Sequence, residues 1–291
     1  MNNINNEAVH PIKGAETAHG GRWTGRCLMV CFAIFFVMLS PIYYLNRWDF
    51  KQRKKRNPFY TSKLVRLQER WPVLYEAAMF VQNFPIPRRV YKVLPFFKGD
   101  VLQVGCGTGL MNKLYKKRKD IRFINMDPNL NALRLGMKWK RYDSYVHAFI
   151  DKPTPLPDRC CDTIIFARSF HHIRNHKRAF RECFRLLRDG GIIIIADPVV
   201  LEEKGNLFGN GYMANSSIDG VIWRFGKMSF IRHLQDCLPE NLHIRDYYDV
   251  RQRHITNYNL FVPQTDLIVI LEKREPNHER SNYRDNFGNK R

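Results

Sequence analysis

Short apolar runs alternate with longer amphipathic segments along the chain from Asp100 onward. Each run is almost continuously apolar, which is the pattern of strands that are buried on both faces of a parallel sheet. The alternation therefore predicts an α/β fold built on a doubly wound sheet. The predicted strands are residues 101–105, 122–126, 145–149, 163–167, 192–196, 243–250 and 266–272.

Apolar residues at helical spacing predict the helices that join most of these strands. Helical spacing within 64–83 predicts one or two further helices before the first strand, which we expect to pack on or cap the folded domain. The helices between strands are predicted at 110–119, 129–140, 175–188 and 228–238. The expected organisation is a folded domain at 99–273, preceded by basic and capping helices at 46–98 and followed by a polar tail at 274–291.

The N-terminal part of the chain contains one long uncharged run. Residues 27–45 read CLMVCFAIFFVMLSPIYYL, about the length that a helix needs to cross a bilayer. A basic cluster follows between Arg47 and Arg56, and the positive-inside rule places that end in the cytoplasm. We therefore expect a disordered segment at 1–26, a single transmembrane helix at 27–45 and the folded domain on the cytoplasmic side. The alternatives are a cleaved signal peptide, although no cleavage-site pattern follows the run, and a buried core helix.

The chain carries 48 Lys and Arg against 27 Asp and Glu, a formal net charge of +21. This excess predicts attraction to a polyanion, either anionic lipid headgroups or nucleic acid, and a generally basic soluble surface is the alternative. The seven cysteines include no CxxC pair and no histidine at zinc-ligand spacing. We therefore expect reduced thiols, a cytosolic compartment and no metal site.

The first predicted strand runs directly into a glycine-rich loop, Gly105-Cys106-Gly107-Thr108-Gly109, and a predicted helix follows at once. Glycines permit a tight turn and let a ligand approach the backbone where a Cβ would block it. The amides at the start of the helix then face the ligand. Leu110 occupies the sixth position, where the dinucleotide-binding pattern G-x-G-x-x-G requires glycine, so the loop departs from that pattern.

The loop instead resembles motif I of the class I S-adenosylmethionine-dependent methyltransferases. The segment TPLPDRCCD at 154–162 resembles the family's LPFPDxxFD, ARSFHH at 167–172 its xxLHH, and FRLLRDGGIIII at 184–195 its xRVLKPGGxLxI. The resemblance runs from about 100 to 198 and is to the small-molecule, type 11 or ubiquinone/menaquinone methyltransferase-like branch. It implies a Rossmann-like, seven-stranded methyltransferase sheet and S-adenosylmethionine as the cofactor.

The resemblance also implies the residues that bind the cofactor, which are Gln103, Gly105, Cys106, Gly107, Gly109, Asp127 and Asp151. In the family, the residue at the place of Asp127 accepts hydrogen bonds from the ribose hydroxyls, and that of Asp151 often receives the adenine amino group. Gln103 stands where the family usually has an acidic residue near the methionine ammonium group. Its amide oxygen accepts a hydrogen bond but carries no charge, so we expect reduced cofactor affinity.

Two adjacent histidines, His171 and His172, follow the fourth predicted strand, at the edge of the sheet where ligands bind. Either is a candidate catalytic base, because histidine accepts a proton near neutral pH. The alternative is that one packs structurally and the other contacts the cofactor. The insertion at 199–226 carries apolar and aromatic residues suited to an acceptor lid, with ordinary loop packing as the alternative. These residues are Tyr212, Met213, Trp223 and Phe225.

The sequence thus predicts a membrane-anchored methyltransferase that acts on a small lipophilic acceptor, such as a lipid, a quinone-type ring or a natural product, by in-line methyl transfer. One alternative is a nucleic-acid methyltransferase. Residues 57–60, NPFY, resemble the NPPY motif of amino-methylating enzymes, but they lie beside the N-terminal run rather than after the fourth strand, so a nucleic-acid partner is not expected. The other alternative is a cofactor-binding scaffold without turnover, which only Gln103 supports.

Overall fold

The computed structural model describes Met38, Pro41 and residues 44–45, 48–53, 55–56, 63–74, 76–77, 92–115, 120–200, 212–216, 220–250, 258–259 and 262–274. The chain divides into two compact units, Met1–Tyr43 and Tyr44–Arg291. Met38 and Pro41 are the described residues of the first unit. All other described residues belong to the second.

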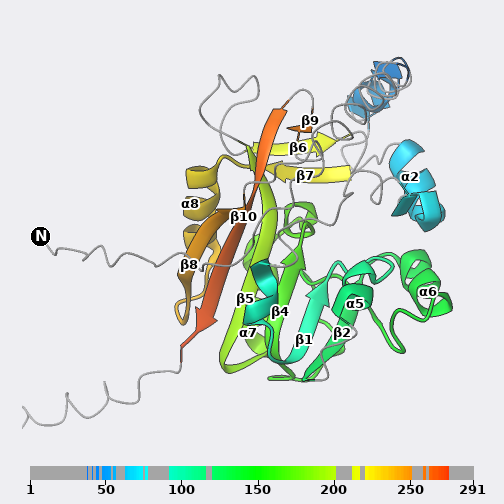
Figure 1. The fold of residues 1–291 in the computed structure, drawn as a ribbon. Helices are drawn as coiled ribbons and strands as arrows, with labels where there is room; N and C mark the ends of the chain where they lie inside the picture. Colours follow the sequence, from blue (N-terminus) through cyan, green and yellow to red (C-terminus); the bar gives the residue numbers. More distant parts are fainter. Residues whose placement is uncertain are drawn as a thin grey trace, which may run out of the picture. The chain divides into compact units, whose positions relative to one another are not determined.

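A sheet forms the centre of the second unit, with strands in the order β3-β2-β1-β4-β5-β10-β8 and a short strand β9 paired with β10 (Figure 1). The strands from β3 to β5 run parallel, whereas β10 runs antiparallel to both β5 and β8. The predicted Rossmann-like sheet of seven strands is thus confirmed. The strands are β1 Gly99–Val104, β2 Ile121–Asp127, β3 Val146–His147, β4 Cys161–Ala167, β5 Leu187–Val200, β8 Leu242–Val250, β9 Tyr258–Asn259 and β10 Val262–Lys273.

The strand order reverses beside β1, because the chain forms β2 on one side of it and later returns to form β4 on the other. In open α/β sheets, ligands bind at such a reversal, outside the carboxyl ends of the strands. These ends are Val104 on β1, Asp127 on β2 and Ala167 on β4. The fold therefore brings the glycine loop, Asp127 and the two histidines to one edge of the sheet.

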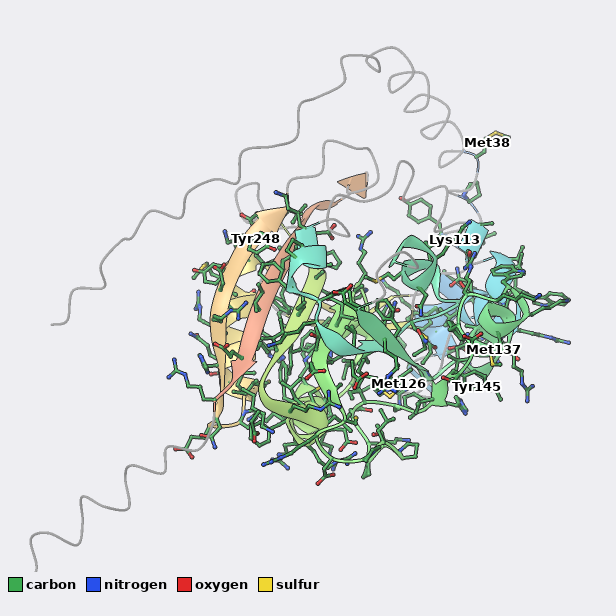
Figure 2. The ribbon with its side chains drawn as sticks, turned by 60° about the horizontal axis from the view of Figure 1, so that its bottom comes forward. Met38, Lys113, Met126, Met137, Tyr145 and Tyr248 are labelled. Atoms are coloured by element: carbon green, nitrogen blue, oxygen red, sulfur yellow. The ribbon has the colours of Figure 1, made fainter. Side chains whose placement is uncertain are left out.

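Helices cover both faces of the sheet, which is why its strands are apolar on both sides. One face packs against α7 and α8 through side chains that include Phe180 and Phe230. The other face packs against α5 and the segment around η1 through Met111 and Phe97. Figure 2 shows Tyr248 of β8 toward one end of the sheet and Met126 of β2 toward the other. The helices are α2 Lys63–Arg70, η1 Leu94–Phe96, α5 Leu110–Tyr115, α6 Leu130–Lys138, η2 Phe170–His172, α7 His176–Leu186 and α8 Lys227–Cys237.

Several elements differ from the prediction. β3 pairs only over Val146–His147, because it is the edge strand and β2 ends at Asp127. β5 begins at Leu187, which already pairs with Cys161 before a shift of register, so α7 ends earlier than predicted. The insertion contains a hairpin, β6 Tyr212–Ser216 and β7 Gly220–Arg224, where the sequence predicted only a lid.

No helix among the described residues has both the length and the apolar character that crossing a bilayer requires. The predicted transmembrane helix at 27–45 lies mostly outside these residues, which include only Met38, Pro41, Tyr44 and Leu45 of it. The predicted disordered segment at 1–26 lies outside them too, as does the polar tail after Arg274. The membrane anchor and its orientation therefore stay predictions.

Candidate cofactor-binding site

The glycine loop turns sharply between β1 and α5. Gly105, Gly107 and Gly109 have φ of +72°, +54° and +78°, the left-handed region in which a side chain is strained. The amides of Gly105 and Cys106 both donate to the carbonyl of Met126, at 2.8 and 3.1 Å. These bonds hold the loop against the end of β2.

Ser169 fixes the first glycine. A Cβ on Gly105 would lie 2.4 Å from the Cβ of Ser169, closer than two such atoms can approach. Ser169 cannot easily withdraw, because its hydroxyl donates to the carbonyl of Val104 at 2.6 Å. Ser169, which lies two residues after the end of β4, therefore packs directly against the glycine loop.

Gly107 has open space where a side chain would stand. Apart from its chain neighbours, no atom of the described residues lies within 4 Å of the place that its Cβ would occupy. Its N–H donates to Oδ2 of Asp127 at 2.8 Å, so the peptide is fixed although the space beside it is free. A Cβ would extend into this space, which is the arrangement expected of a loop that a ligand approaches closely.

Asp127 ends β2 beside Gly107 and is only 8% exposed. Its two oxygens accept from the amides of Gly107 and Asn129, at 2.8 and 2.7 Å. Burial raises the pKa of this carboxyl, while the two amide donors and His147 oppose the rise. Each oxygen keeps a further lone pair, so the carboxylate can also accept from the two hydroxyls of a ribose.

Gln103 lies on β1 with its side chain buried, at 3% exposure. Its Oε1 has no hydrogen-bond partner among the described residues, and the same holds for Oδ1 of Asn125, its neighbour in register on β2. Buried acceptors of this kind are rare, because leaving one unpaired costs about 1–3 kcal/mol. The residues present thus fit a cofactor that brings a donor such as an ammonium group to this place.

Tyr142 fastens the loop to α6. Its hydroxyl lies 3.1 Å from the carbonyl of Gly107 and 3.0 Å from that of Leu133. A Cβ on Gly109 would lie 2.5 Å from the Tyr142 ring, and one on Gly136 would lie 2.3 Å from its hydroxyl. The sequence analysis missed Tyr142, because its packing against Gly109 and Gly136 is visible only in the folded structure.

A second group of contacts joins the loop to the segment after α2. Thr108 donates its hydroxyl to Glu76, and Arg141 forms an ion pair with Glu76 at 2.5 Å. The side chains of Asn129 and Asn131 donate to the carbonyl of Glu69 at the end of α2. The helical segment before the domain therefore packs beside the glycine loop, and Glu76 is a contact that no sequence motif indicated.

Cys106 is buried within the loop, and burial raises the pKa of its thiol well above the ordinary value. The thiol is therefore not a nucleophile at neutral pH. All five cysteines in the described part of the chain are free, which agrees with the expectation of reduced thiols. Cys27 and Cys31 lie outside that part.

Asp151 follows β3 on a turn, and its Oδ2 accepts from the amide of Asn175 at 3.3 Å. Asn175 caps α7 through its own side chain. This contact gives Asp151 a local role in holding the start of α7. Its contact with the adenine amino group stays a prediction.

The two histidines after β4 differ in their surroundings. His171 is buried, and its Nδ1 lies 3.0 Å from both carboxylate oxygens of Asp197. His172 is exposed, and its ring centroid lies 4.2 Å from that of His171. Asp197 was missed by the sequence analysis, although it directly follows the apolar run of the fifth predicted strand, at the same edge of the sheet.

The aromatic residues of the insertion pack inward where they are described. Phe225 is 4% exposed and belongs to the core, and Trp223 donates its Nε1–H to the carbonyl of Ile173 at 2.8 Å. The two rings stack with an interplanar angle of 2°. This favours ordinary packing for Phe225. The side chains of Tyr212 and Met213 lie outside the described residues.

His176 lies under this aromatic group and stacks on Phe170 at 4.2 Å. Its Nε2 lies 3.1 Å from the carbonyl of Phe170 and must donate, so its Nδ1 accepts from Nε2–H of His233 at 2.7 Å. The ring of His176 is therefore neutral, and burial also lowers the pKa of His233. Burial lowers the pKa of His176 to about 3, the nearby His233 and His171 lower it further, and the Phe170 carbonyl opposes them.

This histidine makes stability depend on pH. In the unfolded chain the pKa of this histidine is about 6.5. Below that pH the unfolded state binds a proton at His176, whereas the folded state leaves the ring neutral. We expect the free energy of unfolding to fall by about 2 kcal/mol from this group between pH 7 and pH 5. Urea unfolding of His176→Phe should show a smaller loss over the same interval, and an equal loss in the variant and the wild type would contradict this account.

A glycine loop after β1, an acidic residue at the end of β2 and an antiparallel β10 between β5 and β8 together define a class I S-adenosylmethionine-dependent methyltransferase fold. Residues 102–195 match the family described as a methyltransferase domain. The Burkholderia thailandensis 1,6-didemethyltoxoflavin-N1-methyltransferase, solved with bound S-adenosylhomocysteine, superposes with a TM-score of 0.50 at 15% identity, over 72% of this chain and 88% of that chain.

Two curated relatives match part of the chain. Human thiol S-methyltransferase TMT1A is 25% identical over 142 residues, which cover 46% of this chain and 57% of that protein. A probable S-adenosylmethionine-dependent methyltransferase of Mycolicibacterium smegmatis is 29% identical over 102 residues, covering 34% and 38%. The matches thus span between about two fifths and three fifths of these relatives. Residues 102–195 thus match a methyltransferase domain family, and the matched family and relatives support S-adenosylmethionine as the cofactor.

Proposed function

We propose that the protein transfers the methyl group of S-adenosylmethionine to a small lipophilic acceptor. The observation that carries this proposal is the cradle made by the free space beside Gly107, the buried carboxylate of Asp127 and the unpaired oxygen of Gln103. The cofactor, when bound, supplies an already activated methyl group on a sulfonium. The protein therefore has to bind, align and exclude water more than it has to activate the donor.

Each residue of the cradle has a distinct part in this proposal. Asp127 accepts from the ribose hydroxyls, and the loop from Gly105 to Gly109 lets the cofactor lie close to the backbone. Gln103 accepts from the ammonium group, and Asp151 is the candidate contact for the adenine. Glu76 and Arg141 hold the segment after α2 beside the loop, where it can limit the access of water.

The acceptor class is tested by following transfer of a tritiated methyl group to small thiols, phenols, amines and quinols. Thiols belong in this panel because a partial relative is named a thiol S-methyltransferase. We expect one class to be methylated by the full chain, and transfer at limiting cofactor to be strongly slowed in Asp127→Asn. Cofactor binding without transfer to any class would instead favour a scaffold without turnover, since a fold alone does not fix an activity.

We further propose that residues 27–45 anchor the enzyme in a membrane, with the domain on the cytoplasmic side. The described residues at the end of this run and just after it support the proposal: Tyr44, Leu45 and Trp48 are exposed, and so are Lys51, Arg53, Lys55 and Arg56. Apolar rings next to cations suit the boundary of a bilayer with anionic headgroups. Alkaline carbonate extraction of membranes tests the anchor, because an integral protein stays in the pellet and a peripheral one is released.

A further inference from the structure

We propose that Asp197 positions His171 as the base that takes the proton of the methyl acceptor. The inference rests on the proposed function and adds to it a pair of residues and a division of roles. His171 is the group that meets the acceptor. Asp197 acts through His171, by fixing its ring and the nitrogen that carries its proton.

Asp197 is built to hold the ring. It follows the buried core of β5, is 1% exposed, and its Oδ2 accepts the backbone N–H of His171 at 3.0 Å. Both of its oxygens lie 3.0 Å from Nδ1 of His171. A carboxylate only accepts, so Nδ1 carries the proton and Nε2 keeps its lone pair. This is the tautomer that a base at the opposite side of the ring requires.

The pair lies beside the cofactor loop. Ser169, two residues before His171, packs against Gly105 and donates to the carbonyl of Val104. Arg168 precedes it with φ of +56°, a left-handed conformation that costs a side-chain-bearing residue about 1 kcal/mol or more. Strain held at the carboxyl edge of a parallel sheet, next to a buried acid and histidine, is typical of a functional site.

Other charged groups face the pair and shape its titration. Burial raises the pKa of Asp197 to about 7, Asp266 on β10 adds to the rise, and His172 and Arg168 oppose it. Arg168 also lies 3.7 Å from Asp266, and the neutral His176 lies close enough for His171 to act on it. The pair is competent as a base above pH 7, where Asp197 is ionised.

The chemical step balances without a further reactant. The S–H or O–H proton of the acceptor passes to Nε2 of His171, and the electron pair left on sulfur or oxygen forms the new bond to the methyl carbon. The electron pair of the broken carbon–sulfur bond stays on the sulfur of the cofactor, which becomes neutral S-adenosylhomocysteine. His171 then releases its proton to water, while Asp197 keeps its charge throughout.

The tautomer is tested first, because it needs no acceptor. Nitrogen NMR of the full chain, labelled at histidine and bound to S-adenosylhomocysteine, reports which ring nitrogen carries the proton, and His171→Gln assigns the signal. We expect a neutral ring protonated on Nδ1 at pH 8, and a change to Nε2–H in Asp197→Asn. A ring protonated on Nε2 in the wild type, or unchanged by Asp197→Asn, would overturn the proposal.

Acceptors of matched shape but different acidity then test the base. At pH 8, benzyl thiol and 4-methylphenol mostly keep their protons, whereas thiophenol and 4-nitrophenol are largely ionised. We expect Asp197→Asn and His171→Gln to slow methylation of the protonated member by about 100-fold and that of the ionised member by less than about 3-fold. The exposed Asp143→Asn should alter neither rate. Equal slowing of both members would contradict a base role.

The two tests separate the inference from the function on which it rests. If the wild type methylates none of the four compounds, the proposed function on thiols and phenols fails, and the tautomer measurement still decides the pairing. If the wild type methylates either acidic compound, the comparison within that pair decides the base.

Discussion

Asp127→Asn is expected to weaken S-adenosylmethionine binding by about 100-fold while the protein remains folded. The carboxylate is buried and already accepts from the amides of Gly107 and Asn129, so it is held rigidly in place for the ribose hydroxyls. A hydrogen bond to a charged group contributes about 1.5–3 kcal/mol, and each 1.4 kcal/mol is a tenfold change in affinity. In Asp127→Asn, the side-chain NH₂ group replaces one acceptor oxygen. It then faces a donor, either a backbone N–H or a ribose hydroxyl, and that hydrogen bond is lost.

Equilibrium dialysis with radiolabelled S-adenosylmethionine measures this loss. Asp143→Asn is the matched control, since it makes the same chemical change at an exposed carboxyl between α6 and β3. Circular dichroism establishes that both variants are folded. If Asp127→Asn binds the cofactor within about threefold of the wild type, Asp127 does not hold the ribose and the site has been placed wrongly.

The second large effect is expected at Gly105. Alanine there meets the Cβ of Ser169 at 2.4 Å and adopts φ of +72°, so both packing and backbone conformation oppose it. A left-handed alanine costs about 1–2 kcal/mol, and overpacking of a tight site costs about 1–3 kcal/mol. We expect Gly105→Ala to lower the free energy of unfolding by about 4 kcal/mol and to abolish cofactor binding.

Two other glycines separate strain from the loss of space. Gly190 and Gly107 also have positive φ, but among the described residues nothing beyond their chain neighbours lies within 4 Å of a Cβ at either position. Both alanine variants should lose only about 1 kcal/mol of stability, and only Gly107→Ala should also lose cofactor affinity, because its methyl group fills the cradle. Urea unfolding and a thermal shift with S-adenosylhomocysteine measure the two effects. Unchanged cofactor affinity in Gly107→Ala would argue against a ligand beside this loop.

The sequence predicted those parts of the site that are contiguous in the chain. The glycine loop, Asp127 and the two histidines each follow a strand whose apolar run is plain, and the parallel topology brings them to one edge. Asp197 could have been predicted on the same ground, because it directly follows the apolar run Ile192–Ala196. Only the distance to Nδ1 of His171 shows that it pairs with that residue.

Other contacts could not be predicted because they join residues that are distant in the sequence. Tyr142 closes on Gly109 and Gly136, and Glu76 reaches Thr108 and Arg141, through folding of the whole unit. The length of β3 and the first residue of β5 depend on which residues of β2 and β4 are placed to pair with them. The apolar periodicity within one segment therefore does not reveal these boundaries. The sequence pattern could not separate a lid from ordinary packing at Phe225, because an inward aromatic has the same pattern.

Isothermal titration of S-adenosylhomocysteine into the full chain, solubilised in a mild detergent, tests the central claim most directly. The account predicts one site per chain, with a dissociation constant in the micromolar range that includes the cost of an uncharged Gln103, and no heat of binding in Gly107→Ala. A protein that is folded by circular dichroism yet takes up no S-adenosylhomocysteine would contradict it.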